Sequence, residues 1–337
     1  MGGLLLVPRC GRASSRVMHS MNGHRRSDSP IAHPHRVAVA ALIGLGVLVA
    51  GFAMQGASGG AGDFGYAWSA ARYLLAGMDP YASMDPTAPY GRGGPFLYPL
   101  PAAVVAAPIA ALPPGVAALV FVAIGIGLFA YAMTARGWWG LVALVSAPAV
   151  MTVLSVNWGF LMVAAAMLPG LAWLSAAKPN LGLVALAYHG RARVLIVCLV
   201  FCLATLLLLP SWPLSWLAHI RQQPVAHVPV LLWPLGAIGL VGLLRWRTAE
   251  GRALAAYTVV PVSIVPTDHL MLWLIPRTAR EMVALTASSW LLLPVVLGFL
   301  PGAVPVSGSA IRWLSTLSLV LPCAIIVWRR RYDKSAD

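Results

Sequence analysis

The chain has 337 residues, of which 60% are hydrophobic and only 9% are charged. Soluble domains carry about 25% charged residues, so this composition excludes a soluble globular domain. The net charge of +14 comes from 21 Arg and 2 Lys, placed mainly near the chain ends and in short loops. That pattern is typical of membrane topology signals and contact with anionic lipids, and it excludes nucleic-acid binding.

Residues 1–36 are rich in Arg, His, Ser and Gly and have no hydrophobic period, which predicts a disordered basic cytoplasmic tail. Apolar runs then predict membrane spans near 37–54, 97–112, 115–133, 138–154, 158–175, 179–189, 193–210, 228–244, 253–266, 268–277, 281–300 and 309–328. Several of these runs are shorter than the roughly 20 residues that cross a bilayer, which indicates half-helices or re-entrant segments. We therefore expect an all-α polytopic membrane protein with about 12 (10–12) transmembrane helices.

Basic residues flank this membrane domain, 37–328, on both sides. Arg36 and two further arginines precede the first expected span, and four basic residues follow the last one. Because positive residues favour the cytoplasmic side, we expect both chain ends in the cytoplasm, including a short C-terminal tail, 329–337. Two cytoplasmic ends require an even number of spans in the cell membrane. Because the N-terminus is then cytoplasmic, we expect the loop after the first span, 55–96, to be extracytoplasmic.

The first loop concentrates acidic residues. Three of the nine carboxylates in the chain lie there, on Asp63, Asp79 and Asp85. Acidic residues are rare in membrane proteins and usually serve a function. After Asp63, apolar residues recur at helical spacing as far as Leu75, so we expect an amphipathic helix along the membrane surface, its apolar side toward lipid or the helix bundle.

Asp63 has two interpretations. At the start of the expected helix it suits an N-cap, in which a carboxylate accepts backbone N–H bonds and stabilises the helix by about 1 kcal/mol. Its alternative role is that of a general base, which draws a proton from an acceptor hydroxyl. Asp79 and Asp85 each precede a proline, and a simple turn accounts for both.

Polar residues without an obvious topological role also occur later in the chain, at Asn157, Lys178, Asp268 and His269. A lysine placed like Lys178 either extends to the lipid headgroups or binds a phosphate. His269 suits either a phosphate contact or a structural role at the interface, and Asp268 suits either an acceptor contact or charge neutralisation. The loop aspartates are too widely separated to share a cation, so we expect no metal and no cofactor.

Several of these residues belong to longer motifs. The first loop contains Asp63-x-x-Tyr66, Ala70-Ala71 and Leu74-Leu75-x-Gly77-x-Asp79-Pro80-Tyr81. Later segments contain Tyr98-Pro99-Leu100, Val156-Asn157, Lys178-Pro179-Asn180 and Thr267-Asp268-His269. Over roughly residues 37–300 the chain resembles glycosyltransferase family 87, integral membrane enzymes of the GT-C fold. It departs from the family's Gly-Gln-x-Asn at residues 154–157 and from its Trp-x-His-His at residues 266–269.

The resemblance implies a GT-C-like helix bundle and a polyprenyl-phosphate sugar donor. A hexose, usually mannose and alternatively arabinofuranose, would pass with inversion to a lipid or glycan hydroxyl on the extracytoplasmic face. Asp63 matches the residue taken as catalytic in that family. The substrate-binding residues implied by the motifs are Lys178, His269, Asp268, Asn157, Asp79, Tyr81 and Tyr66.

Two functions of other classes remain as alternatives. A transporter or flippase of a lipid-linked or small polar substrate fits the many spans, although such proteins bind their substrates near the bilayer midplane. A diverged, non-catalytic membrane scaffold fits the two departures from the family motifs.

Overall fold

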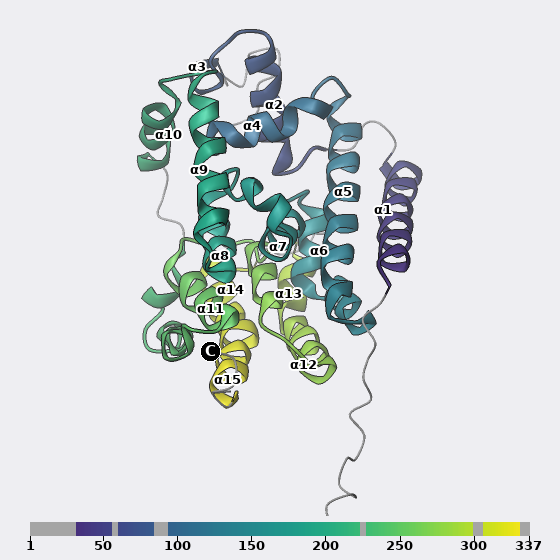
Figure 1. Cartoon of the computed structure of the whole chain (residues 1–337), viewed down its shortest axis with the longest axis vertical. Helices are drawn as coiled ribbons and strands as arrows, with labels where there is room; N and C mark the ends of the chain where they lie inside the picture. The colour runs from purple at the N-terminus through teal and green to yellow at the C-terminus, as the bar shows by residue number, and fades with distance from the viewer. Residues whose placement is uncertain (1–31, 56–59, 84–93, 223–226, 299–305, 331–337) are drawn as a thin grey trace, which may run out of the picture. The chain divides into compact units, whose positions relative to one another are not determined.

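The computed structural model describes residues 32–55, 60–83, 94–222, 227–298 and 306–330, and the described residues are mostly helical (Figure 1). They contain no β-strand, only an isolated bridge between His227 and Val262. The expected N-terminal tail ends earlier than predicted, because α1 (His33–Gln55) begins at His33 with Pro34 in its first turn. Residues 1–31, 331–337 and the loop position Asp85 lie outside the described residues.

Within the described ranges, four helical segments are long and apolar enough to cross a membrane, namely His33–Ala53, Pro114–Arg136, Ala279–Leu297 and Gly308–Arg329. The first is most of α1, and the second is α5 (Pro114–Met133) with η3 (Thr134–Arg136). The third consists of α12 (Ala279–Ser289), η9 (Trp290–Leu292) and α13 (Leu293–Leu297). The fourth consists of α14 (Gly308–Ser315), the π-helical η10 (Thr316–Val320) and α15 (Leu321–Arg329). The described part of the chain is thus helical, with four candidate spans, and the expected number of 12 stays a prediction.

The other expected spans form shorter helices. They are α4 (Leu100–Ala106) with η2 (Ala107–Ile109), η4 (Trp138–Val145), α6 (Ala147–Leu154), α7 (Gly159–Met167), η5 (Pro169–Ala176), α8 (Pro179–His189), α9 (Ala192–Leu206), η6 (Pro229–Leu231), η7 (Gly236–Arg245), α11 (Ala249–Val259) and η8 (Asp268–Leu274). The breaks have local causes. Ser146 ends η4 and caps α6 by accepting the N–H of Ala149, and Pro169 cannot continue the hydrogen bonding of α7.

The first loop contains a helix, α2 (Phe64–Leu75), and its expected position along the membrane surface stays a prediction. Its apolar side packs on the bundle, because Phe64 is buried and its ring stacks on Phe121 of α5 with the centroids 4.1 Å apart. Ala67 and Ala71 on the same side are also buried. Two short helices, α3 (Pro80–Ser83) and α10 (Trp212–Arg221), lie at the same end of the described bundle as α2 (Figure 1).

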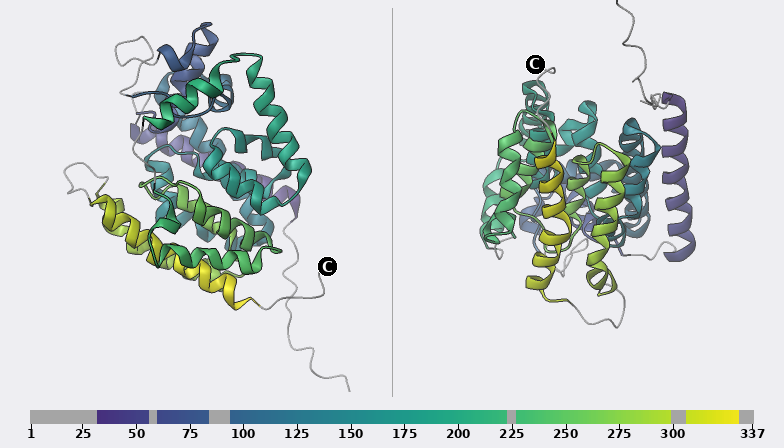
Figure 2. Two further views of the ribbon diagram at one scale, coloured as in Figure 1. Left: turned by 90° about the vertical axis from the view of Figure 1, so that its left-hand side faces the viewer. Right: turned by 90° about the horizontal axis from the view of Figure 1, so that it is seen from below.

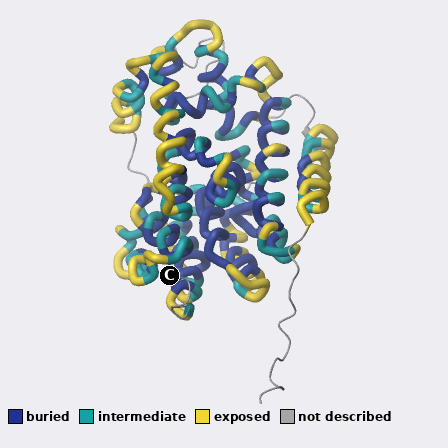
Figure 3. The backbone as a smooth tube through the Cα atoms, viewed as in Figure 1, coloured by how far each residue is buried: buried dark blue, intermediate teal, exposed yellow. Residues whose placement is uncertain are grey.

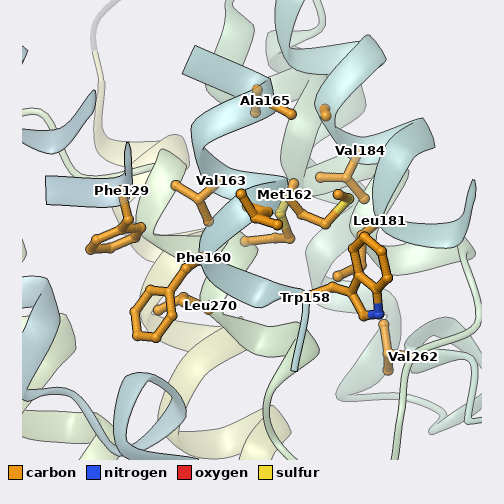
Figure 4. Close-up of a cluster of buried hydrophobic side chains, with 14 of the residues drawn as sticks. Phe129, Trp158, Phe160, Met162, Val163, Ala165, Leu181, Val184, Val262 and Leu270 are labelled. Carbon is orange, nitrogen blue, oxygen red and sulfur yellow. The ribbon is translucent and has the colours of Figure 1, made fainter. Parts of the chain in front are cut away.

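The apolar core is built around α7. All residues of α7 from 159 to 166 are buried, and they contact side chains of α5, α8 and η8 (Figure 4). The labelled partners are Phe129, Leu181, Val184 and Leu270. Trp158, directly before α7, is fully buried and meets the Phe121 ring edge-on at 5.0 Å. The chain entering α7 is therefore held rigidly.

By contrast, α1 lies at the edge of the bundle beside α5 (Figure 2). The two helices approach closely through small residues. A Cβ atom on Gly44 would lie 2.8 Å from the carbonyl oxygen of Ala123, and one on Gly127 would lie 3.2 Å from that of Ala40. The opposite side of α1 exposes leucines such as Leu42, as expected for a helix facing lipid (Figure 3).

Arginines gather at the end of the bundle opposite α2. Arg36 at the start of α1 donates to the carbonyl oxygen of Tyr131 near the end of α5, at 2.7 Å. Arg136 donates to the carbonyl oxygens of Trp273 and Leu274, at the end of the buried segment η8, and of Pro276 just after it. Further contacts there involve Arg252 with the Ala187 carbonyl, Arg277 with Glu250 at 2.5 Å and Arg330 with Glu281 at 2.9 Å.

Candidate functional site

Asp63 precedes α2, and its backbone is held against the turn between α6 and α7. The N–H of Asp63 donates to the Ser155 carbonyl at 2.8 Å, and the N–H of Phe64 donates to the Val156 carbonyl at 3.0 Å. Gly62 makes this approach possible, because it has a φ of +48° and a Cβ atom there would lie 2.3 Å from the Ser155 oxygen. Val156 has a φ of +50°, a region that β-branched residues avoid.

The Asp63 carboxylate makes no capping bond to α2. The N-cap interpretation is therefore wrong for this side chain. Its Oδ2 atom instead accepts the hydroxyl of Tyr98 and, at 2.8 Å, the amide Nδ2 of Asn157. Asp63 and Tyr98 are half-buried, whereas Asn157 is buried. The carboxylate thus lies between the surface and the interior, with donors fixed on its inner side.

Asn157 connects Asp63 to a buried lysine. Its Oδ1 atom accepts the backbone N–H of Trp158 at 2.7 Å and the ammonium of Lys178 at 3.0 Å. Lys178 directly precedes α8, and only 7% of its surface is exposed. Its ammonium also lies 2.7 Å from Oδ1 of Asp268. A buried charge is costly unless paired, and here each charge has a partner of opposite sign.

Asp268 begins η8 and is itself held by further donors. Its Oδ2 accepts the backbone N–H of Ser263 at 2.9 Å and Nδ2 of Asn180 at 3.3 Å. Asn180 also donates to the Pro261 carbonyl at 2.8 Å. Four predicted residues from four parts of the chain therefore form one hydrogen-bonded series, Asp63–Asn157–Lys178–Asp268.

The described hydrogen bond of His269 is made outside this series. Its Nδ1 atom lies 2.6 Å from the hydroxyl of Tyr257, and both side chains are buried. The structure thus places the imidazole beside α11, next in sequence to Asp268 but bonded to a different partner. Its predicted role in substrate binding stays a prediction.

The remaining loop residues lie around Tyr98. Oδ1 of Asp79 accepts the backbone N–H of Tyr81 at 2.8 Å, which is the turn expected from the Asp-Pro pair. The Tyr81 hydroxyl donates to the Tyr98 carbonyl at 2.9 Å, and burial, aided by Asp79, raises the pKa of Tyr81 and keeps this donor protonated. Tyr66 on α2 lies close enough to Tyr98 to interact with it electrostatically. These residues support the segment that carries Tyr98.

Two residues of the cluster were not among the predicted site residues, Tyr98 and Asn180. Both occur in the motifs Tyr98-Pro99-Leu100 and Lys178-Pro179-Asn180, so the signal was present in the sequence. A tyrosine near a membrane boundary is usually an anchor, which is why composition alone does not single out Tyr98.

The described residues contain no group of three or more His, Cys, Asp or Glu side chains that could hold a metal ion. Asp63, Lys178 and Asp268 together carry a formal charge of −1, with the two inner charges offsetting each other. A half-buried carboxylate beside fixed donors can orient a substrate hydroxyl through a hydrogen bond and accept its proton. Charged groups inside an apolar bundle mark a candidate functional site.

Comparisons with models of protein families, with curated proteins and with solved structures find no match for this chain. Over the described residues, the fold and the cluster define a helical bundle with four candidate membrane spans and a buried pair of charges, Lys178 and Asp268.

Proposed function

We propose that the protein is an integral membrane glycosyltransferase. It would move a hexose, mannose in the first instance, from a polyprenyl-phosphate carrier to a lipid or glycan hydroxyl on the extracytoplasmic face of the cell membrane, with inversion. The observation that carries this proposal is the convergence of Asp63, Asn157, Lys178 and Asp268. The family resemblance selected these residues, and they form one bonded series. The two residues of each bonded pair are 21 to 94 residues apart in the sequence.

In the proposed reaction, Asp63 accepts the proton of the acceptor hydroxyl while the oxygen attacks the sugar carbon. The bond from that carbon to the phosphate oxygen breaks, and the polyprenyl phosphate leaves as an anion. Developing negative charge needs preorganised donors or cations. Lys178 is the nearest cation to Asp63 in the series, and two of its three ammonium protons are used by Asn157 and Asp268.

The test uses the full chain, purified and reconstituted in lipid bilayers, with labelled polyprenyl-phosphate mannose and arabinofuranose and extracted membrane glycolipids as acceptors. Asp63→Asn removes the base and keeps the side-chain volume, so we expect transfer to fall by about 100-fold or more. Glu281→Gln, a carboxylate at the arginine-rich end, is the matched control and should retain transfer.

Transfer by Asp63→Asn at the wild-type rate would remove the proposed base. Failure of the wild-type protein to transfer either sugar would overturn the proposed activity. Movement of the intact sugar lipid across the bilayer without transfer would instead identify a flippase.

A further inference from the structure

The amide of Asn157 has one favourable orientation. Its Oδ1 atom accepts two bonds, from the Trp158 N–H at 2.7 Å and from the Lys178 ammonium at 3.0 Å. If the amide rotated by half a turn, its NH2 group would face these two donors and both bonds would be lost. The NH2 group must therefore point in the other direction, toward Oδ2 of Asp63.

Lys178 is fixed in turn. Its ammonium is buried and paired with Asp268 at 2.7 Å, and Asp268 is held by the Ser263 N–H and by Asn180. Backbone structure supports each member, because Pro179 opens α8 directly after Lys178 and Asp268 begins η8. The ammonium therefore presents a rigid donor to Asn157.

The groups that face Asp63 determine which form of its carboxyl is favoured. Among the described residues, the titratable group bonded to Asp63 is Tyr98, before α4; Tyr66 on α2 and Asp268 on η8 act on Tyr98, and Lys178, before α8, bonds to Asn157. Among the described contacts, the donors to Oδ2 of Asp63 are the neutral side chains Asn157 and Tyr98. Donors to a carboxylate oxygen favour the ionised form.

We propose that Asn157, oriented by Lys178, is a positioning residue that holds the Asp63 carboxylate in place and keeps it ionised. Lys178 acts on Asp63 through Asn157, whatever further contact it makes with substrate. Only the consequence for sugar transfer rests on the proposed function, because the ionisation of Asp63 is a property of the protein alone.

The experiment measures protonation of Asp63 directly. A hydrophobic carbodiimide modifies carboxyl groups in their protonated form, and mass spectrometry of the peptide containing Asp63 gives the labelled fraction at each pH. In the full chain in lipid nanodiscs, Asn157→Leu keeps the side-chain volume and removes the donor. We expect the pH of half-maximal labelling to rise by about one to two units, the effect of one hydrogen bond to a charged group.

Two further variants make the result specific. Asn180→Leu is the matched control, because it removes an amide that donates to Asp268 and to the Pro261 carbonyl and makes no bond to Asp63. It should leave the labelling midpoint of Asp63 unchanged, because the Ser263 N–H and the Lys178 ammonium make shorter bonds to Asp268 and still hold it. The double variant Lys178→Met/Asp268→Asn removes both buried charges together and frees the amide of Asn157, so it should shift the midpoint in the same direction, by a smaller amount.

Equal midpoints for the wild-type protein, Asn157→Leu and the double variant would overturn the proposal. The double variant provides the test if Asn157→Leu does not fold.

In the transfer assay, a positioning role predicts a lower kcat for Asn157→Leu with an unchanged KM for the donor. A raised KM at unchanged kcat would instead show a substrate contact. A wild-type protein without transfer activity would overturn the proposed function and leave the labelling result intact.

Discussion

At the scale of single residues, backbone conformation brings the carboxylate of Asp63 to Asn157. Gly62 permits the close pairing of Asp63 with Ser155, and Val156 adopts a positive φ on the other side of the same contact. A β-branched residue at such a φ is strained, and strain of this kind persists only where the surrounding structure enforces it. The burial of Trp158 directly after this turn provides that enforcement.

Gly62→Ala should therefore destabilise the protein and displace Asp63. The matched control is Gly77→Ala, because Gly77 also has a positive φ, of +74°, but a Cβ atom there meets nothing within 4 Å. Gly77→Ala reports backbone strain alone, about 1 kcal/mol or slightly more. Gly62→Ala adds a clash with the Ser155 carbonyl, so its melting temperature in detergent should fall further. Equal losses for the two variants would show that the close contact is unimportant.

At the scale of helices, each apolar run of the sequence contains helical segments, and the bounds expected for 179–189 are those of α8. The run 253–266 is helical only as far as Val259. The number of spans does not follow, because hydropathy does not show where a helix breaks. The expected span 158–175 is divided at Pro169 into α7 and η5, and 138–154 is divided at Ser146. In both cases a local break outweighs a continuous apolar pattern.

The contact between α1 and α5 gives a prediction at this scale. Gly44→Leu would place a side chain where a Cβ atom already lies 2.8 Å from the Ala123 carbonyl oxygen, so we expect α1 to separate from α5. Overpacking of this kind costs about 1–3 kcal/mol, measurable as a lower melting temperature. Gly46→Leu is the control on the same helix, because a Cβ atom at Gly46 meets nothing within 4 Å. If Gly46→Leu is equally harmful, helix propensity or lipid contact explains the loss.

At the scale of the whole described bundle, a group of bonded arginines marks one end, although Arg72 on α2 and Arg221 on α10 lie at the other. Arg36, Arg136, Arg277 and Arg330 bond to groups at one end, while α2 and α4 lie at the other (Figures 1 and 2). Arg136 has a structural role at this end, since it binds the carbonyl oxygens that end η8. This arrangement suits a cytoplasmic arginine-rich end.

Sidedness can be measured with single cysteines in a background without the four native ones. Leu75→Cys at the end of α2 and Ala279→Cys at the start of α12 are both exposed. A membrane-impermeant maleimide added to intact cells should label Leu75→Cys. It should label Ala279→Cys only after the cells are permeabilised, because arginine-rich segments stay in the cytoplasm. The reverse pattern would place the site of Asp63 on the cytoplasmic side and contradict the proposed reaction.

The sequence by itself determined the class of protein, the location of most helices and the residues worth testing. Composition and the length of apolar runs show that the chain suits a lipid bilayer rather than water. In such a sequence charged residues are rare, so Asp63, Lys178 and Asp268 are readily identified as candidates. Only the tertiary structure decided that Asp63 does not cap α2, that Tyr98 and Asn180 belong to the cluster and that His269 faces Tyr257. The physical reason is distance along the chain. The bonds from Asp63 to Asn157 and from Lys178 to Asp268 join residues that are 94 and 90 positions apart. A local sequence pattern does not encode which distant residues the packing around α7 brings together.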